Sequence, residues 1–135
     1  ILLLVTGCMN KTKTLVCTKD IGTSSIDMTQ SIHIKFIDDK VEDMTTTINV
    51  NLPDNYKSYI NTFKTTLEKE YKSKYGSYKN VKLNTKVKND NEIDVTMYFD
   101  YKKMSSSEKK ALNLSGSEKY SVNKKTLEDQ GFSCK

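Results

Sequence analysis

The fold of this protein is specified most strongly by residues 26–36, which read Ile26-Asp27-Met28-Thr29-Gln30-Ser31-Ile32-His33-Ile34-Lys35-Phe36. Apolar residues occupy every second position of this run, with Gln30 as the one interruption, and polar residues fill the positions between them. A period of two over this length is typical of a β-strand that buries one face and exposes the other.

A second run of the same kind follows the short Asp38-Asp39-Lys40 turn. Polar residues separate its inward positions, which are Met44, Thr46, Ile48, Val50 and Leu52. Two alternating strands joined by a short turn predict an antiparallel hairpin whose apolar rows share one face of a sheet.

After Pro53 the apolar period changes from two to that of a helix. Asp54 is placed to cap the helix, and Gly76 is placed to end it. The apolar stripe at helical spacing consists of Tyr56, Tyr59, Ile60, Phe63, Leu67, Tyr71 and Tyr75. We expect this stripe to cover the apolar face of the first hairpin.

Two further regions complete the predicted domain, a second hairpin at residues 81–101 and two short helices after it. Ser105 and Glu108 form a capping-box pattern for a helix through Leu112, and Ser121 is placed to cap a last helix that ends before Gly131. Residues 14–18 are predicted to form a first strand. The chain is therefore predicted to be a single α+β domain over residues 15–135. Its antiparallel sheet consists of two hairpins plus that first strand, with one long amphipathic helix packed on one face.

The start of the chain has a different character, because residues 1–7 are apolar or small and Cys8 precedes a polar segment. Val5-Thr6-Gly7-Cys8 resembles the bacterial lipobox, in which the signal is cut before a cysteine that then carries a diacylglyceryl group. We expect residues 1–7 to be the remnant of a lipoprotein signal peptide, Cys8 to be the lipidation site, and residues 8–14 to form the anchor and tether. The alternative is that residues 1–7 form an ordinary buried strand, with Cys8 as a small core residue.

Composition restricts the partners that the domain is expected to have. The 135 residues carry a net charge of +5, and all 22 basic residues are lysines. The absence of arginine disfavours a dedicated nucleic-acid reader, because arginine is the residue best suited to bidentate phosphate recognition. The lysines either attract the domain weakly to an anionic membrane surface or act as a solvated coat. We expect a monomer whose partners are the membrane, through the lipid on Cys8, and an unknown envelope protein or small ligand.

Four segments together resemble the YehR-like bacterial lipoproteins, and the similarity extends over nearly the whole mature chain. These segments are the hairpin start at residues 34–41, the helix end at Tyr75-Gly76, the strand at residues 93–101 and the ending at residues 127–132. The resemblance implies a small α+β lipoprotein domain whose biochemical role is unassigned. It brings no catalytic residues with it.

Cys17 and Cys134 are the two cysteines that remain once Cys8 is assigned to lipid. The compartment of an exported domain permits disulfides. A bridge between these residues would close a long loop and stabilise the folded state by about 4–5 kcal/mol. The alternatives are two separate buried thiols, or a redox pair that makes the protein a thiol-redox or other enzyme accessory of the envelope. The two residues lack the C-x-x-C spacing that lowers a thiol pKa.

No catalytic residue, metal ligand or cofactor is predicted. His33 is the only histidine and lies on a polar row, which excludes a two-histidine zinc site and leaves one possible catalytic base. A dyad of His33 with Cys17 or Cys134 requires that the bridge be absent. The acidic turns at residues 38–39 and 89–92 lack the spacing of a twelve-residue calcium loop.

The tyrosines provide the remaining candidate site. Five of the eight lie along or just past the helix stripe, where they form either the rim of a core or a surface for stacking bases or sugars. We predict a binding surface at Tyr71, Tyr75 and Tyr78, beside the polar face of the second hairpin. The resulting hypothesis is a lipid-anchored protein at the extracytoplasmic face of the cell membrane that binds or scaffolds and is not an enzyme.

Overall fold

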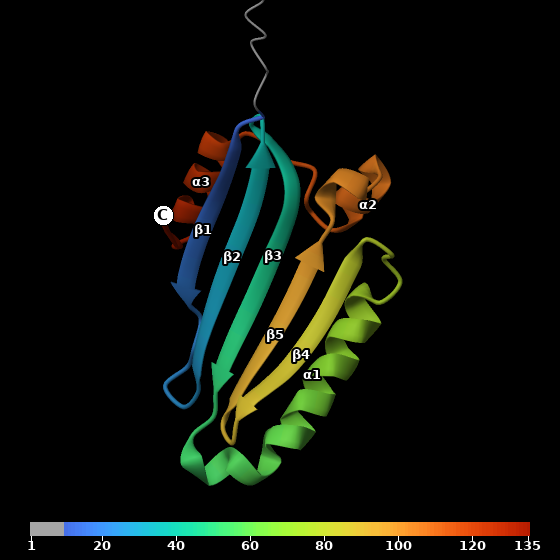
Figure 1. The fold of residues 1–135 in the computed structure, drawn as a ribbon. Helices are drawn as coiled ribbons and strands as arrows, with labels where there is room; N and C mark the ends of the chain where they lie inside the picture. Colours follow the sequence, from blue (N-terminus) through green and yellow to red (C-terminus); the bar gives the residue numbers. More distant parts are fainter. Residues whose placement is uncertain (1–9) are drawn as a thin grey trace, which may run out of the picture.

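The computed structural model describes residues 10–135, so the predicted lipidation residue Cys8 lies outside the described residues. Six strands form one antiparallel sheet in the order β4-β5-β3-β2-β1-β6, of which Figure 1 labels β1 to β5. The strands are β1 (Thr12–Asp20), β2 (Asp27–Ile37), β3 (Lys40–Asn51), β4 (Val81–Asn89), β5 (Glu92–Phe99) and β6 (Ser133–Cys134). The helices are η1 (Asp54–Tyr59), α1 (Ile60–Tyr75), η2 (Tyr101–Lys103), α2 (Ser106–Ala111) and α3 (Tyr120–Asp129), where η marks a 3-10 helix. The predicted α+β class is confirmed.

The first hairpin forms as predicted, by pairing of β2 with β3. The chain reverses at Asp38 and Asp39, whose φ angles are 50° and 61°. Positive φ at two successive residues gives a tight turn whose twist matches that of the flanking strands, and aspartate tolerates this conformation better than most residues. The other edge of β3 pairs with β5, so the second hairpin extends the sheet directly from the first.

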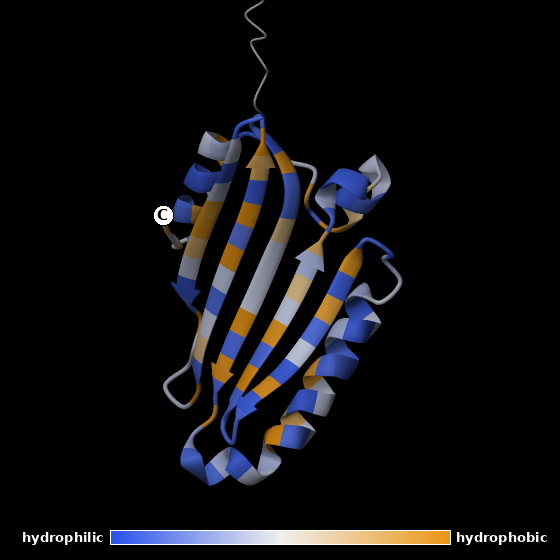
Figure 2. Ribbon diagram, viewed as in Figure 1, coloured by the Kyte–Doolittle hydropathy of each residue, from blue (hydrophilic) through white to orange (hydrophobic). Residues whose placement is uncertain are grey.

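The apolar rows of the five long strands lie on one face of the sheet. Residues directly opposite one another in an antiparallel ladder share a face, and one such row crosses the sheet through Leu15, Ile34, Met44, Phe99 and Val81. The neighbouring rows are polar, and the alternation is visible along the strands in Figure 2. The helices therefore have one apolar face on which to pack.

The long helix α1 covers a different part of that face from the one expected. It lies along β4 and β5 (Figure 1), where Phe63 and Leu67 pack in a cluster with Ile93 and Val95. The expectation that it covers the first hairpin holds only at one end of that hairpin, where Val50 and Leu52 belong to the same cluster. Helical periodicity identifies the apolar side of a helix but not the strands it meets. The face of β1 and β2 is covered instead by the C-terminal segment, through Leu114, Tyr120, Leu127 and Phe132.

The start of α1 also differs from the prediction. Asp54 does not cap the α-helix, because the 3-10 helix η1 intervenes and the Asp54 carboxylate forms an ion pair with Lys57 at 3.2 Å. The helix ends before Gly76 as predicted. A Cβ atom at Gly76 would collide with the carbonyl oxygen of Lys72, so the close approach there requires glycine.

The two C-terminal helices begin in different ways. Helix α2 has the predicted capping box, in which the Ser105 hydroxyl accepts from the Glu108 amide and the Glu108 carboxylate accepts from the Ser105 amide. Helix α3 begins at Tyr120, one residue before the predicted cap Ser121. The Tyr120 amide donates instead to Asp39 Oδ1 at 2.8 Å, so the β2–β3 turn caps a helix 81 residues away in sequence.

Two strand boundaries and one additional strand also differ from the prediction. Strand β1 begins at Thr12 and so takes in part of the predicted tether over residues 8–14. Strand β5 ends at Phe99, and Tyr101 lies in η2. The short strand β6 was not predicted and pairs with β1, which places Cys134 opposite Cys17. The two cysteines form a disulfide with an S–S distance of 2.03 Å.

Candidate functional site

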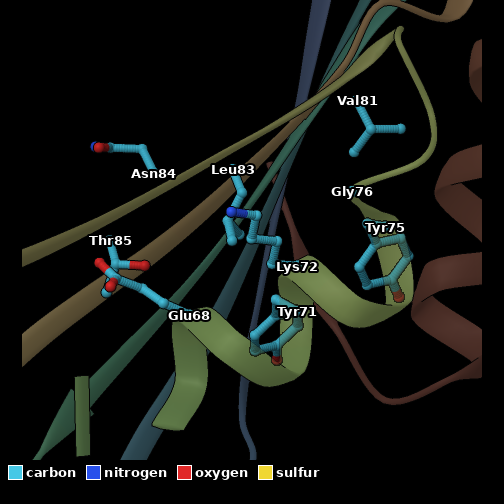
Figure 3. Close-up of a pocket in the computed structure, with 9 residues that line it drawn as sticks. All are labelled: Glu68, Tyr71, Lys72, Tyr75, Gly76, Val81, Leu83, Asn84 and Thr85. Atoms are coloured by element: carbon cyan, nitrogen blue, oxygen red, sulfur yellow. The ribbon is translucent and has the colours of Figure 1, made fainter. Parts of the chain in front are cut away.

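A cavity of about 410 Å³ lies between the C-terminal half of α1 and the edge of β4 (Figure 3). Its lining residues are Glu68, Tyr71, Lys72, Tyr75 and Gly76 on the helix side and Val81, Leu83, Asn84 and Thr85 on the strand side. We refer to it as the α1–β4 groove. Its volume falls within the range of about 300–1,000 Å³ that is usual for ligand sites.

Two of the three predicted tyrosines form one wall of the groove. Tyr71 and Tyr75 lie one helical turn apart, and their rings stack with centroids 6.1 Å apart and an angle of 16°. Tyr75 also contacts the Phe99 ring of β5 edge to face, with centroids 6.4 Å apart. These contacts hold the rings in place. Burial raises the pKa of Tyr71, and Tyr75 and Glu70 add to the effect, so its hydroxyl keeps its proton at neutral pH.

The strand side of the groove carries a polar atom that lacks a partner. Thr85 Oγ1 is buried and makes no hydrogen bond with the described part of the chain. A buried hydroxyl left unpaired costs about 1–3 kcal/mol. Sequence reasoning did not single out Thr85. The available signal was a threonine at an inward position of β4, in a row otherwise made of Val81, Leu83 and Val87.

Tyr78, the third predicted residue, lies elsewhere. It lines a separate cavity of about 240 Å³, together with Lys74, Tyr75 and Leu112. Tyr75 is therefore the residue that the two cavities share. The groove also differs in position from the predicted surface, because Leu83 and Thr85 belong to the apolar rows of the second hairpin and not to its polar face.

The groove itself is lined by one acidic and one basic side chain, Glu68 and Lys72, and further lysines lie on β4. Glu68 is paired with Lys64 at 3.4 Å. Within residues 10–135, the three lysines Lys72, Lys82 and Lys86 take part in no ion pair. Lys72 lines the groove, and Lys82 and Lys86 alternate with its strand residues on the opposite face of β4.

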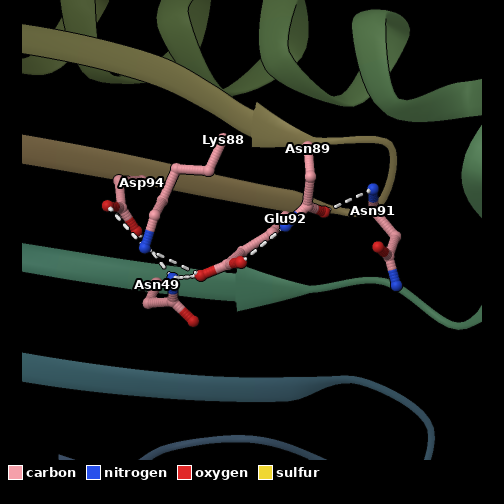
Figure 4. Close-up of polar contacts among 6 residues, drawn as sticks. All are labelled: Asn49, Lys88, Asn89, Asn91, Glu92 and Asp94. Carbon is pink, nitrogen blue, oxygen red and sulfur yellow. Dashed lines mark hydrogen bonds and ion pairs between the residues drawn. The ribbon is translucent and has the colours of Figure 1, made fainter.

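A separate polar network lies at the turn between β4 and β5 (Figure 4). Asn49 Nδ2 donates to Glu92 Oε1 at 2.8 Å and to Asp94 Oδ1 at 2.6 Å, and Lys88 lies 3.0 Å from Glu92. The hydrogen bond from Asn49, followed by that from Lys88, lowers the pKa of Glu92. Glu92 is therefore an ionised acceptor that ties β5 to β3, and it is not suited to donate a proton.

The remaining candidates from the sequence do not form a catalytic group. Cys17 has no exposed surface and is bridged to Cys134, so neither side chain is a free thiol. Cys17 pairs with Ile32 on the apolar face, whereas His33 is exposed on the other face, and the cysteine–histidine dyad does not form. In the described part of the chain, no three His, Cys, Asp or Glu side chains are grouped closely enough to hold a metal ion. No helix over residues 10–135 has the length and apolar composition needed to cross a membrane.

Comparison with known proteins gives a likeness in fold. No family model matches the chain, and the curated proteins contain no significant match. Among solved structures, the chain is similar to the NMR structure of a protein from Streptococcus pneumoniae TIGR4, with a TM-score of 0.58 and 19% sequence identity. The match covers 93% of this chain and 86% of that chain. At this identity the likeness concerns the fold alone.

Proposed function

We propose that this protein is a lipid-anchored binding module of the cell envelope, and that its ligand occupies the α1–β4 groove. The observation that carries the proposal is the construction of the groove. It combines a ligand-sized volume with a wall of stacked tyrosines. An apolar cavity with a few fixed polar groups is the usual form of a binding site.

The chemistry of the groove favours binding over catalysis. Its acid, Glu68, forms an ion pair with Lys64 at 3.4 Å. Nucleophilic catalysis needs a nucleophile within hydrogen-bonding distance of a base, and the Thr85 hydroxyl makes no hydrogen bond with the described part of the chain. Tyr71, which lines the groove, can instead donate a hydrogen bond to a ligand that rests against the rings.

Three features support a location at the extracytoplasmic face of the membrane. The Val5-to-Cys8 pattern resembles a lipobox, and the four matching segments resemble the YehR-like lipoproteins. The Cys17–Cys134 disulfide is a kind of bond that persists in oxidising compartments. A diacylglyceryl group on Cys8 would supply two acyl chains, which hold a protein at a membrane stably where one chain does so only marginally.

The groove is tested by NMR titration of the isotope-labelled protein with a library of small neutral and charged fragments. We expect chemical-shift changes to cluster on Tyr71, Tyr75 and Thr85. Thr85→Phe places a ring in the groove and should abolish them, whereas Thr29→Phe, on the exposed polar face of β2, should leave them unchanged. Shift changes that cluster elsewhere, or that persist in Thr85→Phe, would contradict the proposal.

The anchor is tested by metabolic labelling with a palmitate analogue in a bacterial host. We expect the native protein to take up the label and to fractionate with membranes. The Cys8→Ala variant should lose both properties while Cys17→Ala keeps them. A native protein that stays unlabelled in a host that labels its other lipoproteins would contradict the anchor.

The redox alternative predicts accessible cysteine chemistry at Cys17 and Cys134. The complete burial of Cys17 disfavours attack on its sulfur, because thiol–disulfide exchange depends on access. Titration of thiols in denaturant without reductant separates the two functions. A structural bridge leaves both cysteines unreactive, whereas a redox pair isolated in its reduced form gives two reactive thiols.

A further inference from the structure

The backbone of β4 presents unpaired groups along the groove. The Asp100 amide donates to the Asn80 carbonyl at 2.9 Å, which marks these two residues as a hydrogen-bonded pair of the β4–β5 ladder. Such pairs recur at every second residue of an antiparallel ladder. Even-numbered residues of β4 therefore face β5, and the amides and carbonyls of Leu83 and Thr85 point away from it.

The hydrogen bonds between β5 and β3 lead to the same assignment of which backbone groups face β4. The Leu52 amide donates to the Asn91 carbonyl at 2.7 Å, and the β3–β5 register continues from there through Val50 and Ile93. Odd-numbered residues of β5 thus face β3, which leaves its even-numbered residues to face β4. Because β4 is the outermost strand, the groups of Leu83 and Thr85 lie on an open sheet edge.

The open edge and the groove belong together. Leu83 and Thr85 direct their side chains into the groove that Tyr71 and Tyr75 line from the other side. An extended polypeptide that paired with β4 would run about 4.8 Å from it, between the strand and α1. Every second side chain of that polypeptide would enter the groove, and the others would lie beside Lys82 and Lys86. Recognition by strand addition combines main-chain hydrogen bonds with pockets for alternate side chains in this way.

Lysines near the β4 edge favour a negatively charged ligand. Lys72 at the groove and Lys82 and Lys86 on the other face of β4 have no ion-pair partner within the described residues. Lysines on an edge strand also discourage pairing between identical edges. Two copies of β4 paired about Asn84 would set Lys82 directly opposite Lys86, and like charges in that position are destabilising. A second copy of this chain is therefore disfavoured, and an acidic segment is favoured.

We propose that the β4 edge of the groove binds an extended acidic segment of a partner protein as an added strand. The inference rests on the proposed function, because it assigns a ligand class to the same groove. The segment alternates apolar side chains, which contact Tyr71, Tyr75 and Leu83, with acidic side chains, which lie beside Lys82 and Lys86.

The test uses a capped synthetic peptide, acetyl-Glu-Val-Asp-Ile-Glu-Val-Asp-Ile-Glu-amide, and the full chain with its disulfide intact. We expect binding, with increased protection of the Leu83 and Thr85 amides from hydrogen exchange. Two further peptides are N-methylated at every second residue, one at the odd-numbered and the other at the even-numbered positions. Each of them lacks the amide donors along one of its two edges. The peptide whose methylated amides face β4 should bind at least about tenfold more weakly than the unmethylated peptide, since each lost hydrogen bond can reduce the affinity by up to about that factor.

The role of charge is tested by reversing the charges on β4 and, separately, those of the peptide. Lys82→Glu/Lys86→Glu should weaken binding of the acidic peptide by about tenfold or more and strengthen that of its all-lysine counterpart. Lys40→Glu/Lys119→Glu makes the same change in net charge far from β4 and should alter both affinities much less. A reversal of preference confined to the β4 variant supports the proposal, and equal effects of the two variants count against it.

The remaining outcomes separate this inference from the function on which it rests. If fragments bind the groove but the peptide fails to protect Leu83 and Thr85, strand addition is wrong and the groove remains a binding site. Equal affinity for the unmethylated peptide and both methylated peptides also overturns strand addition. If neither fragments nor peptide bind the groove, both proposals fail together.

Discussion

The two halves of the apolar sheet face are closed in different ways. Over β1 and β2, the C-terminal segment packs on Leu15, Cys17 and Phe36, which are at most 1% exposed, and a disulfide fastens it. Over β4 and β5, α1 leaves the groove, where Leu83 is half-buried and the Thr85 hydroxyl lacks a partner. A dense, covalently closed half lets the other half keep a cavity that lowers stability, which is how stability and binding are commonly divided within one domain.

The disulfide should give the largest effect, because it fixes the closed half by joining residues 117 apart in sequence. Cys17→Ala/Cys134→Ala should lower the free energy of unfolding by about 4–5 kcal/mol, as measured by urea denaturation. Thr18→Ala/Ser133→Ala alters the neighbouring pair of the same ladder and serves as the control. A loss no larger than that of the control would mean that the bridge contributes little to the difference between the halves.

Two matched leucine truncations compare the packing of the halves. Leu15→Ala removes a side chain with no exposed surface and should cost about 3–4 kcal/mol. Leu83 borders an existing cavity, so Leu83→Ala removes fewer contacts and should lower the free energy of unfolding by about 1 kcal/mol. Thermal and urea unfolding of both variants measure the difference, and equal losses would show that the groove half is packed as tightly as the other.

Two matched threonine substitutions test whether the groove half carries an uncompensated polar group. Thr85→Val should raise the free energy of unfolding by about 1 kcal/mol, because it removes a buried hydroxyl that has no partner. Thr46 is also buried, but its hydroxyl accepts from Gln30 Nε2 at 3.4 Å. Thr46→Val should therefore leave the free energy of unfolding unchanged or lower it by up to about 1 kcal/mol. A destabilised Thr85→Val would show that the hydroxyl is satisfied in solution.

The smallest effect should come from Glu92, whose network stabilises the hairpin of the groove half without a covalent bond. Because the pKa of Glu92 is lowered in the folded state, its carboxylate adds stability at neutral pH. That contribution is lost as the pH falls below the ordinary glutamate value of about 4.3 and through the lowered pKa. Glu92→Gln should therefore be less stable than the native protein at pH 7 and closer to it at pH 3. Glu70→Gln, which removes a carboxylate outside the network, should show a smaller change between these pH values.

Local patterns in the sequence were enough to predict most of the strands and helices. The period-two rows of residues 26–36 and 44–52 and the Ser105–Glu108 capping box depend on near neighbours, and the structure contains each of them. Alternation also places side chains on faces correctly, because the period of a strand fixes which residues share a face. The tyrosine wall could be located for the same reason, since the helical period puts Tyr71 and Tyr75 on one side of α1.

The features that were missed depend on residues far apart in the sequence. The cap of α3 comes from Asp39, and the cover of β4 and β5 by α1 follows from the pairing of β3 with β5. Neither has a local signal. The lack of a partner for Thr85 depends on every side chain around it, so no pattern in β4 alone could predict it.

The position of the disulfide has a mechanical consequence. Strand β1 enters the sheet at Thr12, and Cys17 in its middle is joined covalently to the C-terminal strand. A pulling force applied at residue 10 would load the β1–β2 ladder and could peel residues 12–16 outward. At Cys17 the force would pass into Cys134 as well, so that further extension would have to detach both ends of the chain at once. The bridge thus acts as a stop against forced extension of the domain from its N-terminal side.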